Sequence, residues 1–464
     1  MSLASHSRWP TRAAEVTRRT SLNLVLDTLR NEILSGALRP GDPVNENVIA
    51  ARLGVSHTPV REAIMDLIGE GFVESGPNRR RHVAHYSPGR AVAIVQLQGL
   101  LHQFGLLRIA ETASGSEIDE LADRFADTAH ALVESDGPAI DTATARQVLT
   151  TCRLARHTAL ATALPRASHR GFALVLLPAE AWQLWRDWGV TMGQFAEQLR
   201  NREVVRTAHD YLAAEMALAA RIDELWPEPA PWADGEVIGE TRAEAVARRM
   251  RSEILTGTLP AGEAIRETEL AAQYGVSTTP VREALRLLVA DDLVEVEANR
   301  RRRVADPGQT EMADRITMIH HLVTWQLRVG LPRITRSQFE ELAGLAARLA
   351  AIMSAPAAPT RNDDSPGFAA LVLEVFEFFA RAAGNQEVWT VVRNGLDAVL
   401  PHWARSGVRL EPYGRIYRDL AALDHDERTP GVSRLVDELF TGGLDHLASD
   451  GPGPRLSVAG PGRD

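Results

Sequence analysis

The sequence contains no lysine, so all 51 of its basic side chains are arginines. This absence excludes a Schiff base to pyridoxal phosphate and the lysine of a phosphate-binding loop. The one cysteine, Cys152, cannot form an internal disulfide or an all-cysteine zinc site, which is typical of a protein from a reducing cytoplasm. Long apolar runs are also missing, because the best candidate, residues 172–177, is interrupted by Pro178. We therefore expect a cytoplasmic protein with no export signal and no membrane span.

Charge is distributed unevenly along the chain. The net charge is −10, yet residues 1–87 hold 11 arginines against 9 acids and residues 242–308 hold 11 of each. The excess of acidic residues therefore lies in the remaining segments. With 464 residues the chain is too long for one compact core, and its apolar share of 45% is ordinary for a soluble globular protein. The two segments in which arginines balance the acids are the candidates for contact with a polyanion.

A short stretch in the first of these segments occurs again in the second. Residues 55–63 read Val-Ser-His-Thr-Pro-Val-Arg-Glu-Ala, and residues 276–284 read Val-Ser-Thr-Thr-Pro-Val-Arg-Glu-Ala, 221 positions later. The offset holds without a gap over residues 25–84, and about half of the paired positions are identical. Such agreement indicates an internal duplication.

Each copy of the stretch predicts the second helix of a helix-turn-helix. Ser56 and Ser277 lie at the N-cap, and the proline in the first turn removes no helical hydrogen bond. Apolar residues at 60, 63, 64, 67 and 68, and at 281, 284, 285, 288 and 289, predict an inward face. Shorter helices over residues 22–34 and 46–53 precede it, the latter with Val48 inward. The opposite face carries His57, Thr58, Arg61 and Met65 in the first copy and Thr278, Thr279, Arg282 and Arg286 in the second. Short polar groups and arginines at the leading end of a helix suit the major groove of DNA, and Ser56 and Ser277 are included among the predicted DNA contacts.

A basic hairpin follows each of these helices and predicts a wing. One short strand is expected on each side of the basic tip, so each wing has two strands. The hairpins carry Asn78, Arg79, Arg80 and Arg81 in the first copy and Asn299, Arg300, Arg301, Arg302 and Arg303 in the second. Arginines in series beside a recognition helix indicate contact with DNA, and a solvated turn is the alternative.

The rest of the chain divides around the two copies. We expect a disordered basic arm over residues 1–20, winged helices over 21–87 and 241–306, a proline-rich linker over 226–240 and a disordered tail over 449–464. Residues 88–225 and 307–448 are rich in alanine and leucine at helical spacing, and each predicts an all-helical domain of six or seven helices. The predicted fold class is therefore mainly α.

The motif Gly-Val-Ser-x-Thr-Pro-Val-Arg-Glu-Ala, at residues 54–63 and 275–284, resembles that of the GntR family of bacterial transcription regulators. A helical domain after each wing is similar to the FadR-like branch, whose ligand domain is of the FCD type. Typical members have one copy and form homodimers, so this chain resembles a dimer fused into one polypeptide, and further homodimerisation is left open. The resemblance implies a regulator of double-stranded DNA, most often a repressor, and not an enzyme. A structural DNA-binding protein with degenerate ligand domains is the alternative.

The resemblance also bears on base recognition. His57 and Thr278 stand where the family usually has an arginine that reads guanine edges. Because the two copies differ at this position, we expect an operator that is an imperfect palindrome.

Metal and effector sites are implied by the resemblance alone. The metal positions of the family hold Val372 and Phe376 in the second copy and Arg153 and His157 in the first, so we expect no cofactor and a degenerate divalent-metal site. A small carboxylic acid is the effector that the family implies. The candidate residues for binding it are Arg108, His157 and Arg328, the arginines through a bidentate fork. An ordinary structural role is the alternative for each of them.

Overall fold

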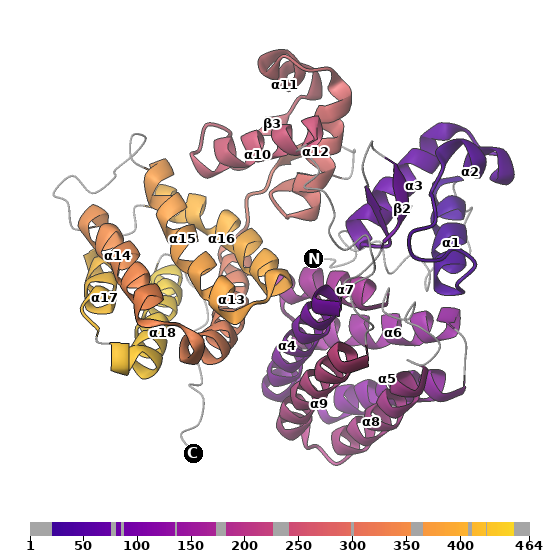
Figure 1. Ribbon diagram of the computed structural model, residues 1–464, viewed down its shortest axis with the longest axis horizontal. Helices are drawn as coiled ribbons and strands as arrows, with labels where there is room; N and C mark the ends of the chain where they lie inside the picture. The colour runs from indigo at the N-terminus through magenta and orange to yellow at the C-terminus, as the bar shows by residue number, and fades with distance from the viewer. Residues whose placement is uncertain are drawn as a thin grey trace. The chain divides into compact units, whose positions relative to one another are not determined.

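The computed structural model describes residues 21–75, 80–84, 88–134, 137–172, 182–225, 241–297, 301–353, 365–406, 411–423 and 425–449 (Figure 1). The chain divides into two compact units, residues 1–239 and 240–464. Each unit contains a winged helix followed by a helical bundle, and the mainly α fold class is confirmed. The division between the units falls within residues 226–240, which lie outside the described residues, as do the predicted arm and residues 450–464.

The two winged helices have the same order of elements. The first consists of α1 (Ser21–Leu34), α2 (Glu46–Leu53), α3 (His57–Glu70), β1 (Val73–Ser75) and β2 (Arg81–Val83). The second consists of α10 (Arg242–Leu255), β3 (Ala264–Ile265), α11 (Glu267–Tyr274), α12 (Thr278–Ala290), β4 (Val294–Val296) and β5 (Arg302–Val304). The recognition helices predicted from the repeated stretch are therefore α3 and α12.

A glycine ends the helix before each recognition helix. Gly54 has a φ of +62° and Gly275 a φ of +67°, a left-handed conformation that residues with a Cβ rarely adopt. The other end of α2 is closed by Asn45, whose side chain accepts the N–H of Asn47 at 2.9 Å. These local signals place the sharp turn between the two helices.

The inward face of the recognition helices is confirmed. Residues 60, 63, 64 and 67 of α3 and residues 281, 284, 285 and 288 of α12 are all 0% exposed. Ile68 and Val289 are only partly buried. The expectation that Val48 points inward is wrong, because its side chain is 61% exposed. Helix α2 has two turns and packs through Ile49 and Ala50, so Val48 lies on its solvent side.

The predicted wings are antiparallel hairpins. Val73 pairs with Val83 in the first, and Val294 pairs with Val304 in the second. Strand β3 adds a third member in the order β3-β5-β4, whereas an isolated bridge from Pro43 to His82 occurs in the first copy. The sequence did not indicate β3, since two residues are too few to show the alternation of a strand.

The first bundle is formed by α4 (Pro88–Thr112), α5 (Gly115–Glu134), α6 (Gly137–Ala155), α7 (Thr158–Phe172), α8 (Trp182–Arg200) and α9 (Val204–Leu225). Helix α4 packs against α6, α7 and α9. Its residues 89–112 are long and apolar enough to cross a membrane, but 72% of the most apolar window is buried inside the protein. The apolar side chains of α4 therefore form the core of this bundle.

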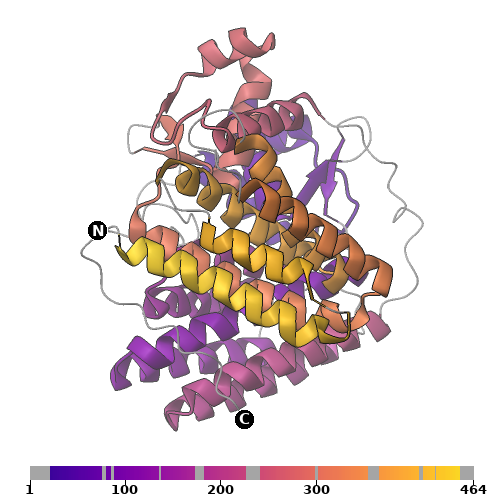
Figure 2. The same ribbon diagram turned by 90° about the vertical axis from the view of Figure 1, so that its left-hand side faces the viewer.

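The second bundle is formed by α13 (Gln309–Gly330), α14 (Arg336–Met353), α15 (Ser365–Ala383), α16 (Gln386–Ser406), α17 (Glu411–Ala421) and α18 (Arg428–Ser449), with short 3-10 turns at Leu331–Arg333 and His425–Glu427. Figure 2 shows α18 along the outer face of this bundle, next to α17. Six α-helices in the described part of each bundle agree with the number expected from the sequence.

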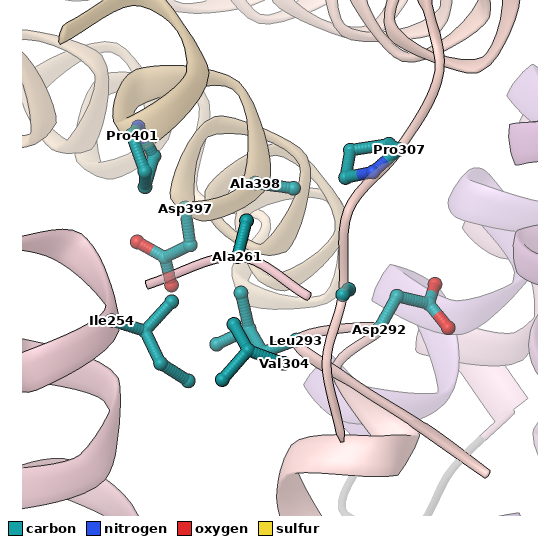
Figure 3. Close-up of a pocket in the computed structure, with 10 residues that line it drawn as sticks. Ile254, Ala261, Asp292, Leu293, Val304, Pro307, Asp397, Ala398 and Pro401 are labelled. Atoms are coloured by element: carbon teal, nitrogen blue, oxygen red, sulfur yellow. The ribbon is translucent and has the colours of Figure 1, made fainter. Parts of the chain in front are cut away.

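Buried ion pairs fix the second winged helix to its bundle. Arg251 of α10 donates hydrogen bonds both to Asp291, at the C-cap of α12, and to Asp397 of α16. Asn394 of α16 donates to the other oxygen of Asp291 at 3.1 Å. Residues from both domains, among them Ile254, Leu293, Asp397 and Pro401, line a neighbouring cavity of about 10 Å³ (Figure 3). This volume has room for about one water molecule, so the cavity is part of the packing and not a ligand site.

Candidate nucleic-acid interface

The leading ends of both recognition helices are exposed. His57 and Thr58 in the first copy and Thr279 in the second are exposed, and Thr278 is half-buried. The N-cap positions of Ser56 and Ser277 are confirmed, but neither side chain accepts a hydrogen bond from its helix. Short polar side chains at the N-terminus of a helix are suited to donating hydrogen bonds to a phosphate.

The recognition-helix arginines are held by glutamates of the preceding helix. Arg61 of α3 donates to Glu46 of α2 at 3.3 Å, and Arg282 of α12 donates to Glu267 of α11 at 2.5 Å. The two arginine side chains nevertheless remain 56% and 60% exposed. A guanidinium has five N–H donors and uses one edge for a carboxylate, so the remaining donors can contact DNA. The glutamate thus sets the direction in which the arginine points.

The same two glutamates also hold an arginine of each wing. Arg81 of β2 donates to Glu46, and Arg302 of β5 donates to Glu267 at 2.7 Å. The side chains of these two arginines are only 18% and 21% exposed. Burial lowers the pKa of the Arg302 guanidinium from its usual value. Each domain therefore contains a cluster of arginine, glutamate and arginine that joins the recognition helix to the wing.

Glu46 and Glu267 were not among the residues selected from the sequence. Their spacing could have identified them, because an arginine follows each glutamate after 15 and again after 35 residues in both copies. Repetition of three charged residues at one offset is a stronger signal than a single pair. Sequence spacing alone does not show that strands and helices so far apart meet.

The remaining wing residues fall into three groups. Arg80 and Arg301 are exposed beside the hairpin. In the strand that follows, Arg303 donates two hydrogen bonds to Glu295 at 2.8 and 3.0 Å, and its counterpart His82 lies 3.1 Å from Glu74. The predicted contacts Asn78, Arg79, Asn299 and Arg300 lie outside the described residues. Because Arg80 and Arg301 are exposed, they are accessible to DNA.

The two recognition helices differ at a second position besides 57 and 278. Met65 of α3 corresponds to Arg286 of α12, and both side chains are half-buried. The Met65 sulfur lies 3.7 Å from the Arg81 guanidinium that donates to it. One copy therefore has a neutral thioether where the other has a cation, so the two surfaces predicted to face DNA differ in charge.

Contacts within the protein account for two of the three residues considered for effector binding. Arg108 donates to Glu111 at 2.6 Å on its own helix. His157 is buried, accepts the N–H of Leu160 at 3.2 Å and lies edge-on to a phenylalanine, which is the structural role given above as the alternative. Arg328 is exposed in the last turn of α13.

A larger cavity lies inside the first bundle. Its volume is about 60 Å³. The residues that line it come from helices α4 to α9 and include Gln98, His102, Thr128, Thr144, Gln147, Gly171, Trp185, Trp188, Tyr211 and Glu215. Among the described residues, this lining contains neither an arginine nor any of the three residues considered for effector binding.

Within the described ranges of the chain, no group of three His, Cys, Asp or Glu side chains could hold a metal ion. Arg153, at one of the metal positions implied by the family resemblance, pairs with Glu120 at 2.6 Å. Val372 and Phe376, at two of the others, are buried in the apolar core of the second bundle.

Comparisons with known proteins concern mainly the winged helices. Residues 23–83 and 242–304 match the family described as bacterial regulatory proteins, gntR family. A probable D-xylose utilization operon transcriptional repressor of Paenarthrobacter nicotinovorans is 48% identical over 60 residues, which are 13% of this chain and 26% of that protein. An uncharacterized HTH-type transcriptional regulator in an unstable DNA locus of Streptomyces ambofaciens is 38% identical over 77 residues, or 17% of this chain and 33% of that protein. This chain thus spans a third or less of the length of these two relatives.

One solved structure is similar to part of this chain. E. coli McbR/YncC aligns with 45% of this chain and 98% of its own, at a TM-score of 0.39 and 17% sequence identity.

Proposed function

Both winged helices of this chain match the gntR family of bacterial regulatory proteins, and from that match we propose that the chain is a sequence-specific DNA-binding transcription regulator of the bacterial cytoplasm. The observation that carries the proposal is the repetition of one surface. In both copies the recognition helix presents an exposed arginine, which a glutamate of the preceding helix orients. Repression is the proposed outcome of binding, since the D-xylose operon relative is described as a repressor.

The two copies are proposed to act as a pseudo-dimer within one chain. Each winged helix would read one half-site, as the two subunits of a dimeric helix-turn-helix protein do. Phosphate contacts would set affinity and its dependence on salt, while the leading ends of α3 and α12 would select the bases. The bundles would be effector domains of the FCD type, as in the FadR-like branch. The order of a winged helix followed by six helices, found twice, supports this assignment.

Arg61 and Arg282 provide the test of DNA binding. A duplex selected from a random-sequence library is used in gel-shift titrations at two or more salt concentrations. We expect each arginine-to-alanine variant to weaken binding about ten- to a hundredfold, as expected for an arginine at a base or phosphate. If the arginine contacts a phosphate, the salt dependence also falls by roughly one counterion.

Arg206→Ala is the matched control for these variants. This arginine is also exposed and ion-paired, with Glu203 at 2.9 Å, but it lies on α9 in the first bundle. Its replacement removes the same charge and should leave binding unchanged. Undiminished binding by the double variant of Arg61 and Arg282 would refute the proposal.

An imperfect palindrome is proposed as the operator, because the DNA-facing residues of the two copies differ. The variant His57→Thr with Met65→Arg gives α3 the residues that α12 has at these two positions. Random-sequence selection should return unequal half-sites for the native chain and more symmetric ones for the variant. Equal half-sites for the native chain would contradict this part of the proposal.

The carboxylic-acid effector implied by the resemblance finds little support. The cavity in the first bundle lacks an arginine among the described residues that line it. A carboxylate entering it would lose its hydration without gaining a cationic partner. The chemistry of the lining favours a ligand of the opposite charge.

A further inference from the structure

The cavity in the first bundle is rich in hydrogen-bond acceptors and aromatic rings. Glu215 of α9 is 4% exposed and receives a hydrogen bond from the Tyr211 hydroxyl. His102 of α4 lies 3.1 Å from the backbone oxygen of Gln98. Since a carbonyl oxygen only accepts, the His102 Nδ1 carries the hydrogen, and its Nε2 is left as an acceptor.

Two polar atoms of the lining are buried without a hydrogen-bond partner. They are the Gln147 Oε1 of α6 and the Trp185 Nε1 of α8. Buried polar atoms are nearly always paired, and an unpaired one costs about 1–3 kcal/mol. The Gln147 oxygen is an acceptor in the same lining as the Glu215 carboxyl, and a ligand with N–H donors would satisfy it.

Aromatic rings surround the same space. Tyr211 stacks on His102 with ring centroids 4.7 Å apart, and Trp188 lies edge-on to Tyr211 at 5.6 Å. Trp185 and Trp188 both line the cavity. Tryptophan and tyrosine faces attract cations, especially where water is excluded.

We propose that this cavity binds a small organic ammonium ion, with the nitrogen against the Glu215 carboxylate and the alkyl group beside Trp185 and Trp188. The volume of about 60 Å³ corresponds to roughly four to six water molecules, which suits a ligand of about five non-hydrogen atoms. Neither the acid implied by the family resemblance nor a larger metabolite has these properties. The regulatory meaning of this site rests on the proposed function, whereas binding itself is independent of DNA.

Proton release accompanies binding in this scheme. Burial raises the pKa of Glu215 to about 8 and lowers the pKa of His102 to about 4, so both groups are uncharged at pH 7. Tyr211 is the third titratable group of the described lining, and burial raises its pKa well above the usual value. When an ammonium ion enters, the Glu215 carboxyl loses its proton to solvent and forms the ion pair. Close to one proton is therefore released per ligand at pH 7.

A route from the cavity to the DNA-binding surface exists within this unit. Helix α7 contributes Gly171 to the lining and packs against the recognition helix α3. A Cβ at Gly171 would lie 2.2 Å from the Gln98 side chain, so this end of α7 is tightly packed on the cavity wall. Displacement of the wall by a ligand would be transmitted to α3 through direct contact.

The test uses n-butylammonium chloride on the full chain without DNA, with sodium butyrate and n-butanol as comparison ligands at equal ionic strength. We expect n-butylammonium to raise Tm in a saturable way, with half-saturation at about millimolar concentration, the range for a ligand of this size. Titration calorimetry in two buffers of different ionisation enthalpy should report the release of close to one proton. Butyrate and butanol should give no saturable shift.

Glu215→Gln distinguishes binding of n-butylammonium in the cavity from its weak adsorption to the protein surface. The variant should bind n-butylammonium at least tenfold more weakly and release no proton. Glu224→Gln removes an exposed acid from the same helix and should behave as the native chain does. If Glu215→Gln fails to fold, Trp185→Phe provides the test instead. This variant keeps an aromatic ring and should also weaken binding of n-butylammonium.

The proposal is overturned if butyrate or butanol stabilises the chain equally. It is also overturned if n-butylammonium has no effect, or if its effect persists undiminished in Glu215→Gln. Loss of DNA binding with intact ammonium binding would instead refute only the proposed function, so the two failures are distinguishable.

Discussion

In the ion cluster at Arg251, replacing the arginine should cost far more stability than replacing the aspartate Asp397. Asp397 is 0% exposed, its Oδ1 has no hydrogen-bond partner, and its other oxygen accepts from Arg251, whose side chain is 16% exposed. Burial is the largest influence on Asp397 and raises its pKa, although the nearby guanidinium opposes this. The ion pair therefore repays only part of the cost of burying the carboxylate.

Arg251→Met should be strongly destabilising. The variant keeps most of the side-chain volume, but Asp291 loses its ion pair with Arg251, and Asp397 keeps only Arg393, whose Nε lies 4.0 Å from its Oδ2. Removing one partner of a buried pair costs about 3–5 kcal/mol, because the remaining charge is uncompensated. The loss should appear as reduced stability of the second unit in denaturant titration of the full chain, followed by circular dichroism.

Asp397→Asn should cost much less, within about 1 kcal/mol at pH 7. The amide oxygen still accepts from Arg251, and the buried charge is gone. The sign of the pH dependence follows from the raised pKa. The Asp397 carboxyl binds its proton more tightly in the folded protein, so its contribution to stability is present at low pH and is lost as the pH rises through its folded-state pKa. The free energy of unfolding of Asp397→Asn should therefore rise relative to that of the native chain as the pH increases.

Arg30→Met is the control, since Arg30 lies 221 residues before Arg251. Its guanidinium is 3.9 Å from Asp27 on the same helix and 6.0 Å from the centroid of the Phe72 ring. Contacts of these kinds contribute about 1 kcal/mol or less each. If Arg251→Met costs no more than Arg30→Met, or if Asp397→Asn costs as much as Arg251→Met, the reasoning about the buried cluster is wrong.

Two further predictions concern Glu215 in the first unit and the helix caps of the second unit. Burial raises the pKa of Glu215 to about 8, so the stabilising contribution of this carboxyl is complete below about pH 4.5 and is lost as the pH rises through 8. The Tm of Glu215→Gln, measured relative to that of the native chain, should therefore be higher at pH 9 than at pH 5. If the difference in Tm between the variant and the native chain is the same at both pH values, the pKa of this carboxyl is not raised. Thr241→Ala should cost about 1 kcal/mol in thermal unfolding, because Thr241 and Glu244 form a capping box at the start of α10. Ser277→Ala should cost only a few tenths, because that hydroxyl accepts no helical N–H, and a larger cost would contradict this account of the cap.

Local features of this protein could be predicted from its sequence. Both ends of α2, the start of α3, the buried stripe on the recognition helices and the wing hairpins followed from glycines, capping residues and periodicity. These signals act over a few residues and are present twice, so each copy supported the interpretation of the other. The place of Arg61 on the exposed face was therefore predictable, and its DNA contact stays a prediction.

Contacts between distant residues were decided by the tertiary structure. Glu46 meets Arg81 across 35 residues, and Arg251 meets Asp397 across 146. Val48 is exposed although its spacing is that of a core residue, because the packing of α2 gives it no neighbour to cover it.

The cavity in the first bundle needs side chains from six helices to exist at all. Sequence periodicity tells which side of a helix is apolar, whereas the partner of a polar side chain depends on how the helices pack against one another. For this reason the sequence determined the duplicated winged helices, and only the folded bundle revealed Glu215 among tryptophans.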